Sequence, residues 1–464
     1  MPARELPGVA NPGEHGIAEM VGGTEAAIRL QMRAPLLSET EQRAFRQLGV
    51  FVGGWTLEAA EAVCTGAGDQ GGEVLDDLES LTAKSLVRQE DTTRAEPRFT
   101  MLEKIHEFAR EHLAQSGEAE ACGRSHAAYY SALVEATEPE LMTAQEAGGL
   151  DKLEREHDNL QAALRWCVKA QDASTGLRLS GVLWRLWLIR GYLSEGSRWL
   201  EELLALPGAT ASKIGLPKVL NGAGNLAAAR GDYQQARMYF QEALALRREL
   251  GDKRGIAQSL LNLGNLAGER GDYKTARDLF EESLALRREL GDERGVARSL
   301  QNLGAVAREE GDYTQAADLC QNALAVARMV GDQETVAMAM IGLGILARHQ
   351  GQDERALALL RESLRQFNRL GDRREIAECL ELLAGLAGVR GHPDQAVRLL
   401  GAADALIEAT GLAPGPVERY QYESNRAGLE AQLGEIKFAT AWSEGRKLSL
   451  QQAVALALEE RVAS

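Results

Sequence analysis

The sequence predicts an all-α protein made mainly of stacked helix pairs, and two observations carry this prediction. Only 5% of its 464 residues are aromatic, while alanine, leucine, arginine and glutamate dominate, and these side chains lose little rotamer freedom on a helix. The second observation is a repeat of 40 residues, in which Gly-Asp-Tyr begins at Gly231, Gly271 and Gly311. A chain of this length avoids one very large core when each repeat packs on its neighbours.

Each repeat is expected to contain two helices, because a second Gly-Asp series falls midway between the first. Its members are Gly251, Gly291, Gly331 and Gly371. In one unit we predict a first helix from Arg254 to Arg270 and a second from Tyr273 to Leu290. Glycine after the second helix supplies a left-handed C-terminal cap. Apolar residues recur at three- and four-residue spacing, as helices that pack on two neighbours require.

Small residues recur inside the first helix of each unit. They are Gly224, Gly264, Gly304 and Gly344. A glycine in a helix interior costs about 1 kcal/mol relative to alanine. Its repeated presence at one position therefore predicts close approach of the partner helix backbone.

The series Leu263-Gly264, Ala267, Ala276, Phe280 and Ser283 is similar to the signature of the tetratricopeptide repeat (TPR). It departs from that signature in its 40-residue period, in Leu260 where tryptophan is common, and in lacking a late proline. The resemblance implies an α-solenoid that binds partners along a concave groove.

The N-terminal part has a different organisation. Residues 1–35 are rich in glycine and proline without periodicity, and we predict a disordered tail. A capping box of Ser38 and Glu41 starts a helix, and two more helices are expected over Thr56–Cys64 and Glu73–Lys84. Two short β segments then flank a polar turn, near residues 86–88 and 98–101, which indicates a hairpin. Three helices followed by a hairpin predict a winged-helix module.

The charge of this module argues against direct binding of nucleic acid. The third helix carries Glu73, Asp76, Asp77 and Glu79 against one lysine, and the whole chain has a net charge of −16. Phosphates are repelled by such a surface. A regulator that binds DNA through the winged helix remains an alternative hypothesis.

Five stretches together resemble the C-terminal part of bacterial signal-transduction ATPases with numerous domains (STAND). They are residues 36–64, 85–87, 98–113, 153–166 and 420–450. In that family a nucleotide-binding NB-ARC domain precedes the winged helix and a TPR sensor follows it. No Gly-Lys dipeptide of a phosphate loop occurs in this sequence. Met101-Leu102-Glu103 stands where the family has Met-His-Asp, so nucleotide sensing by this chain is not expected.

Other chemistry has no candidate in the sequence. Five cysteines lie far apart, which suits buried thiols in a reducing compartment, and the apolar stretch Val182–Ile189 is too short to span a bilayer. His106 and His112 lie on different faces of one predicted helix and no His-Glu-x-x-His motif occurs. We therefore expect a cytoplasmic protein that is not an enzyme and needs no cofactor or metal.

Asparagines on the first helices form the one candidate binding site. Asn221 and Asn225 are four residues apart and Asn262 and Asn265 three, with Asn302 one unit later, so each pair shares a helix face. The TPR resemblance implies that this face lines the groove and that its amides hold a peptide backbone.

Three arginines complete the predicted site. Asn225, Asn262 and Arg298 partly match the clamp of TPRs that hold a C-terminal carboxylate, and Arg308 and Arg348 are expected to receive an acidic segment. Two alternatives stay open. The asparagines could merely satisfy contacts between helices, or a small ligand could bind near Trp184, Trp187 and Trp199.

The predicted organisation has five parts. They are a disordered tail (1–35), a winged-helix-like module (36–117), a helical bridge with a first TPR-like unit (118–207), a TPR array (208–411) and a C-terminal helical cap (412–464). We expect an adaptor or sensor module of a STAND-type regulator, with a protein or peptide partner.

Overall fold

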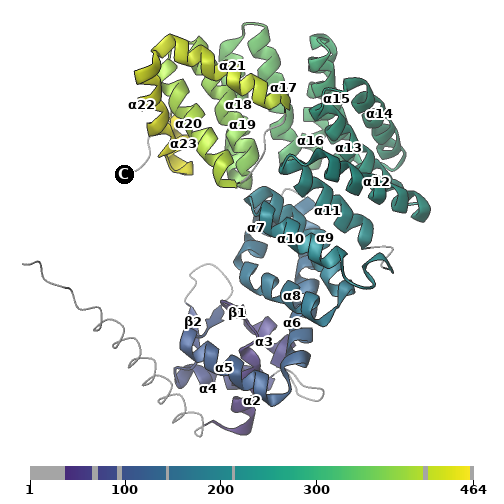
Figure 1. The fold of residues 1–464 in the computed structure, drawn as a ribbon, viewed down its shortest axis with the longest axis vertical. Coiled ribbons are helices and arrows are strands. Elements are labelled where there is room, and N and C mark those ends of the chain that lie inside the picture. The colour runs from purple at the N-terminus through teal and green to yellow at the C-terminus, as the bar shows by residue number, and fades with distance from the viewer. Residues whose placement is uncertain are drawn as a thin grey trace, which may run out of the picture. The chain divides into compact units, whose positions relative to one another are not determined.

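The computed structural model describes residues 37–64, 72–90, 97–142, 146–211, 215–410 and 416–459 (Figure 1). The chain forms two compact units. Among the described residues, the first unit comprises those from 37 to 133 and from 155 to 170, and the second comprises those from 134 to 154 and from 171 to 459. The predicted disordered tail lies outside the described residues.

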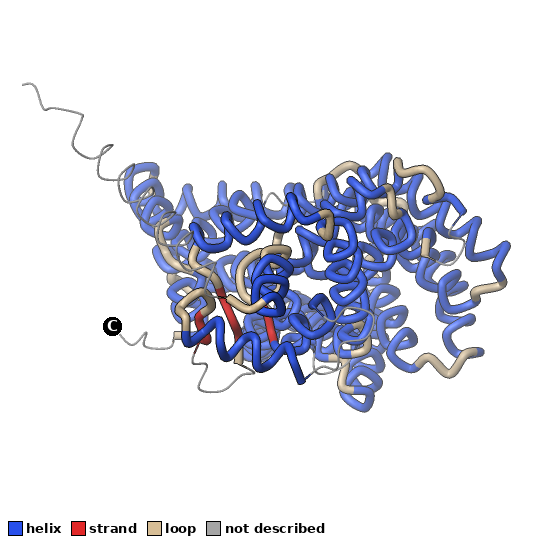
Figure 2. Tube along the Cα trace, turned by 90° about the horizontal axis from the view of Figure 1, so that it is seen from below, coloured by secondary structure: helices blue, strands red, loops and turns tan. Residues whose placement is uncertain are grey.

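The first unit contains the three helices and the hairpin that the sequence predicts. Its elements are α2 (Glu39–Leu48), β1 (Trp55–Thr56), α3 (Leu57–Cys64), α4 (Gly72–Ala83), β2 (Arg88–Glu90), β3 (Arg98–Thr100), α5 (Glu103–Ser116), α6 (Ala119–Thr137) and α8 (His157–Ala170). The strands, red in Figure 2, form an antiparallel sheet in the order β1-β3-β2. Phe99 of β3 pairs with Trp55 of β1 on one side and with Gln89 of β2 on the other. Strand β1 was not predicted, because two residues carry no detectable alternation.

The start of the first unit confirms the predicted capping box. Glu41 N donates to Ser38 Oγ at 3.2 Å and Ser38 N donates to Glu41 Oε2 at 2.7 Å. Behind this helix the core is aromatic: the rings of Phe51 and Trp55 stack at 5.3 Å, and both side chains are fully buried. Burial of such side chains stabilises the unit.

Helix α8 packs with the first unit although it follows α7 (Glu146–Arg155) of the second. Asn159 accepts a hydrogen bond from Val52 N at 2.8 Å and donates one to Gly54 O at 2.9 Å. Arg98 of β3 forms an ion pair with Glu156, which also accepts from Tyr130 Oη at 3.1 Å. The compact unit therefore extends past the boundary predicted at residue 117.

The second unit is a succession of helix pairs. Its helices are α7, α9 (Ala173–Arg190), α10 (Leu193–Leu204), α11 (Leu216–Ala229), α12 (Tyr233–Leu250), α13 (Lys253–Glu269), α14 (Tyr273–Glu289), α15 (Glu293–Glu309), α16 (Tyr313–Val330), α17 (Gln333–His349), α18 (Asp353–Leu370), α19 (Arg373–Val389), α20 (Pro393–Thr410), α21 (Pro416–Leu433), α22 (Glu435–Arg446) and α23 (Leu450–Leu458), with short 3₁₀ turns at Glu140–Met142 and Ala209–Ala211. The two helices predicted for the unit at residues 254–290 are confirmed to within one residue at each end.

The recurrent Gly-Asp dipeptide ends one helix and starts the next. Gly271 has a φ of +76°, which a left-handed turn requires. Asp272 is then the N-cap of α14 and accepts a hydrogen bond from Thr275 N at 3.2 Å. The sequence predicted Gly271 as a helix break and the glycines after the second helices as left-handed caps, which Gly251 confirms at the end of α12 with a φ of +67°. The capping role of the aspartate was missed.

The glycines inside the first helices do lie at a close approach, but side chains of the partner helix occupy the space. A Cβ on Gly264 would lie 2.4 Å from the ring of Phe280, and one on Gly224 would lie 2.4 Å from the ring of Phe240. In the later repeats the opposing residue is smaller, and on Gly344 the Cβ would lie 3.0 Å from Leu360 Cγ. The predicted backbone contact is thus replaced by a side chain at Gly224, Gly264 and Gly344. At Gly304 the partner backbone does lie close, because a Cβ there would be 3.4 Å from Ala316 O and 2.8 Å from Cys320 Sγ.

Helix α9 at the start of the array contacts helices far along the chain. Arg190 donates to the carbonyl oxygen of Leu370 at 3.0 Å, at the end of α18, and it also pairs with Glu154 at 2.8 Å. Arg185 pairs with Glu334 of α17 at 2.7 Å. These contacts join the first helix pair to helices about four repeats later, so the second unit closes on itself.

Candidate binding cavity

The first helices of successive repeats surround one cavity of about 410 Å³ in the second unit. Most of its lining comes from α11, α13, α15, α17 and α19, with further side chains from α9, α12, α14 and α21. This volume lies within the range of ordinary ligand sites. The cavity is therefore the concave surface that the TPR resemblance leads us to expect.

Four of the predicted asparagines line this cavity, and the fifth lies behind them. Asn225, Asn262, Asn265 and Asn302 belong to the lining. Asn221 is buried and accepts a hydrogen bond from Asn262 Nδ2 at 2.7 Å. Asn262 Oδ1 in turn accepts from Gln258 Nε2 at 3.0 Å. The alternative interpretation, contacts between helices, thus describes Asn221 and Asn262.

Asn265 and Asn302 differ, because together they present open hydrogen-bonding groups to the cavity. Asn302 Nδ2 donates to Asn265 Oδ1 at 2.6 Å. In the described part of the chain, the remaining amide group of Asn265 and the remaining carbonyl of Asn302 have no protein partner. A bond between two side-chain amides uses one N–H and one oxygen lone pair, so the NH2 group of one residue and the carbonyl oxygen of the other always stay available. That combination matches a peptide group.

The predicted arginines are already engaged by carboxylates or lie outside the lining. Arg308 lines the cavity and pairs with Glu309 at 2.8 Å. Arg298 pairs with Asp332 at 3.4 Å and with Glu334 at 2.5 Å. The side chain of Arg348 lies against Gly385, where an added Cβ would be 3.0 Å from Nη1. This geometry does not favour the predicted capture of an acidic segment.

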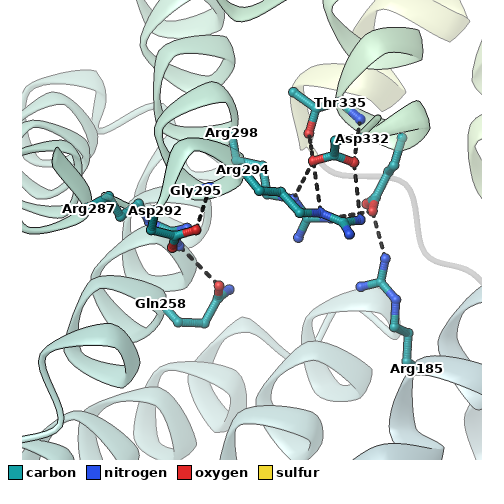
Figure 3. A network of polar contacts seen from close by, with 10 residues as sticks. Arg185, Gln258, Arg287, Asp292, Arg294, Gly295, Arg298, Asp332 and Thr335 are labelled. Atoms are coloured by element: carbon teal, nitrogen blue, oxygen red, sulfur yellow. Dashed lines mark hydrogen bonds and ion pairs between the residues drawn. The ribbon is translucent and has the colours of Figure 1, made fainter. Parts of the chain in front are cut away.

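The pairs of Arg298 belong to a larger network that joins α15, α17 and α9. Figure 3 shows Arg294 and Arg298 directed at Asp332, while Arg185 approaches from another helix. Asp332 is fully buried and caps α17, accepting from Thr335 Oγ1 at 2.7 Å. Burial raises the pKa of Glu334, but the guanidinium groups of Arg298 and Arg185 outweigh it and hold that pKa at about 2. The carboxyl group of Glu334 thus stays ionised at neutral pH.

Acidic residues on α19 were missed by sequence reasoning. Glu375, Glu378 and Glu381 recur every three residues and all line the cavity, so they share one helix face. A signal was available in the repeat: Met338 and Glu378 are 40 residues apart and both line the cavity. Adding one repeat period of 40 residues to Met338 identifies Glu378, and adding two periods to Gln301 identifies Glu381, whereas Glu375 has no counterpart in the lining among the earlier repeats.

Three tyrosines also line the cavity and were considered only as part of a turn signal or of the tail. Tyr233 and Tyr273 belong to the Gly-Asp-Tyr motif, and Tyr422 comes from α21. Burial and the nearby carboxylate of Asp404, which accepts from Tyr422 Oη at 3.2 Å, raise the pKa of Tyr422. The tyrosine therefore stays neutral and presents an aromatic face.

The tryptophans considered for a small-ligand pocket serve packing instead. Trp187 and Trp199 are almost fully buried, and Cβ atoms on Gly196 and Gly222 would lie 2.7 Å from Trp187 and 2.6 Å from Trp184. None of the three lines the 410 Å³ cavity. They fill the space between α9, α10 and α11.

Helix α4 of the first unit presents acid rather than base to solvent. Asp76 and Glu79 are exposed, and Lys84, just past the helix, pairs with Glu41 at 2.6 Å. Hydrogen bonds from Lys84 and Ser80 lower the pKa of Glu41 to about 2. Exposed carboxylates of this kind disfavour contact with a phosphate backbone.

The repeats match a known family. The sequence model of the tetratricopeptide repeat matches residues 216–289 and 295–369, which are the helices α11 to α18. This array is a tetratricopeptide-repeat solenoid. Among the described residues, no helix is long and apolar enough to cross a membrane.

Curated relatives share a segment with this chain. Proteins of Mycobacterium bovis and Mycobacterium tuberculosis, whose names describe inferred HTH-type transcriptional regulators, are 35% identical over 193 residues. That segment is 40% of this chain and 22% of each relative. The match therefore spans less than a quarter of the length of those proteins.

Solved structures with similar helical arrangements share little sequence. A STAND protein with a TPR sensor from Pyrococcus horikoshii has a TM-score of 0.46 at 13% identity, covering 90% of this chain and 64% of that one. A Rap protein in complex with competence and sporulation factor has a TM-score of 0.44 at 11% identity, covering 69% of this chain and 100% of that one.

Proposed function

We propose that this chain is a non-enzymatic interaction module of a signal-transduction or transcription regulator, and that its TPR cavity receives an extended peptide segment. The Asn265–Asn302 pair carries the proposal, because it offers the NH2 group of Asn265 and the carbonyl oxygen of Asn302 to the cavity. A peptide main chain presents the complementary acceptor and donor at every residue. TPR arrays in general use their concave surface for such partners.

The first unit would act as the relay of this regulator. Its helices and β2–β3 hairpin follow winged-helix order, and its STAND resemblance together with the regulator names of the curated relatives supports a regulatory context. The acidic α4 favours a protein-facing role over contact with DNA. A nucleotide-binding domain would act together with this chain in that scheme.

The test uses a displayed library of random seven-residue peptides and the full chain. We expect selected peptides to bind the wild-type protein and to lose about tenfold or more in affinity to the double variant Asn265→Ala, Asn302→Ala. Each lost hydrogen bond to a partly buried partner costs about 1 kcal/mol, and two act together. Isothermal titration calorimetry gives the affinities.

Asn322→Ala is the matched control, since Asn322 is an exposed asparagine on α16 that does not line the cavity. Asn262 is unsuitable because its amide holds Asn221. Selected peptides that bind wild type and the double variant equally would contradict the proposal. Failure to select any peptide, with thermal stabilisation by a small metabolite instead, would favour the small-ligand alternative.

A further inference from the structure

The charge of the cavity lining is strongly asymmetric. Five glutamates and two arginines line it: Glu269, Glu309, Glu375, Glu378, Glu381, Arg308 and Arg374. The formal charge of the lining is therefore −3. This sum includes every ionised side chain of the lining, so it does not depend on which of them form ion pairs with one another. Even with Arg348, which lies beside the cavity at Gly385, the carboxylates remain in excess.

Pairs within the lining occupy both arginines. Arg308 pairs with Glu309 at 2.8 Å, and Arg374 of α19 reaches across to Glu269 of α13 at 4.0 Å. Of the ionised side chains in the lining, α19 contributes three carboxylates, Glu375, Glu378 and Glu381, which share a face, and one cation, Arg374. In a concave site with low-dielectric walls such a row attracts cations more strongly than it would on an open surface.

We infer that the peptide received by the cavity is basic, with lysine or arginine side chains directed at α19 while its main chain lies on the Asn265–Asn302 pair. This inference rests on the proposed function and adds the chemical class of the partner.

The dimensions suit this arrangement. From Glu375 to Glu381 the helix rises about 9 Å, which is the length of about three residues of an extended peptide. Alternate side chains of such a peptide point to the same side, so two cationic side chains separated by one residue would face the carboxylate row. Tyr233 and Tyr273 add aromatic faces on which a guanidinium stacks favourably.

The experiment selects random seven-residue peptides on the wild-type chain and sequences the enriched pool. We expect enrichment of lysine and arginine, and about a tenfold loss of affinity for the best peptide in the double variant Glu378→Gln, Glu381→Gln, because amides replace charge-assisted partners. Circular dichroism checks that the variant keeps its helicity and melting temperature.

Non-specific attraction to an acidic protein needs a matched control. Glu249→Gln, Glu281→Gln removes the same two charges from exposed sites on α12 and α14, outside the cavity. Affinity should stay within about twofold of wild type there. An equal loss in both double variants would overturn the inference.

Two further outcomes separate this inference from the function on which it rests. If neutral or acidic peptides are enriched and their binding still needs Asn265 and Asn302, the basic partner is wrong and the peptide-binding function stands. If no peptide binds above the level of the asparagine double variant, both are wrong.

Discussion

His126 in the first unit is a histidine that the fold holds neutral. Its side chain is buried between Phe51 and Tyr130, with ring centroids 5.3 Å and 4.7 Å away. Burial lowers its pKa from 6.5 to about 4, although an interaction with Asn159 at 3.5 Å partly opposes the shift. The unfolded chain therefore binds a proton at mildly acidic pH that the folded chain does not.

This shift predicts that the first unit loses stability as the pH falls from about 6.5 towards 4. Because the pKa of His126 is lower in the folded chain than in the unfolded chain, its contribution to stability is complete above pH 6.5 and falls as the pH decreases. At pH 4.5 the free energy of unfolding should be lower by roughly 2–3 kcal/mol. Urea unfolding at pH 7 and pH 4.5, followed by hydrogen exchange in α6, measures the difference. His126→Gln should start less stable at pH 7 and depend less on pH, whereas the same change at the exposed His112 should leave the wild-type slope. Equal slopes in all three proteins would rule the explanation out.

Individual site residues were predictable by type but not by role. The spacing of the asparagines placed them on one face, and four of them do line the cavity. Which amides remain open depends on pairs formed across repeats, such as Asn262 with Asn221 and Asn302 with Asn265. Those pairs join residues 41 and 37 positions apart, and their geometry follows from helix packing that the spacing does not specify.

Within a helix pair, a glycine on the first helix makes room for a larger side chain on the second. In the second full repeat Gly264 accommodates the ring of Phe280, while in the fourth Gly344 faces the smaller Leu360. We expect Gly264→Ala to lower the free energy of unfolding by about 1–2 kcal/mol, because overpacking exceeds the gain in helix propensity. Gly344→Ala should be close to neutral.

A compensating change tests the same pair. Phe280→Leu in the Gly264→Ala background should recover most of the loss, since leucine is the residue found opposite Gly344. The free energies come from urea unfolding monitored by circular dichroism. A destabilisation of Gly344→Ala as large as that of Gly264→Ala, or no recovery in the double variant, would show that the ring is not the cause.

The helices of the repeats were the features of this protein that could best be predicted from the sequence. The Gly-Asp period located α13 and α14 because each dipeptide carries both a helix end and a helix start. Prediction of elements from the sequence was least successful in the first unit. Strand β1 has only two residues there, and α8 packs with this unit although α7 of the second unit precedes it in the chain. Hydrogen bonds of Asn159 to the main chain of Val52 and Gly54 hold α8 in place, and such long-range bonds cannot be predicted from the local sequence pattern.

For the whole molecule, the net charge of −16 bears on the class of partner only in part. It argues against nucleic acid, as do the exposed carboxylates of Asp76 and Glu79 on α4. The negative charge of the cavity lining was not predictable from the sequence, because it depends on α19 lying opposite α13. The ion pair between Arg374 and Glu269, which are 105 positions apart in the sequence, shows this arrangement. Single arginines such as Arg308 suggested an acidic partner until their carboxylate neighbours were known.

Repeat arrays ordinarily behave as one-dimensional chains, in which end repeats fray first and neighbours alone share stability. The arginines of α9 change that expectation for the second unit, because Arg185 and Arg190 attach an end of the array to α17 and α18. Native-state hydrogen exchange should therefore show α9 and α18 opening together, in one cooperative event.

In the double variant Arg185→Gln, Arg190→Gln, helix α9 should open at a free energy about 1–3 kcal/mol lower, since Glu334 keeps Arg298 as a partner. If α9 opens independently of α18 already in the wild type, the contacts of Arg185 and Arg190 do not couple the two helices. If the coupling holds, the array unfolds as a ring, and a ligand in its centre stabilises every repeat at once.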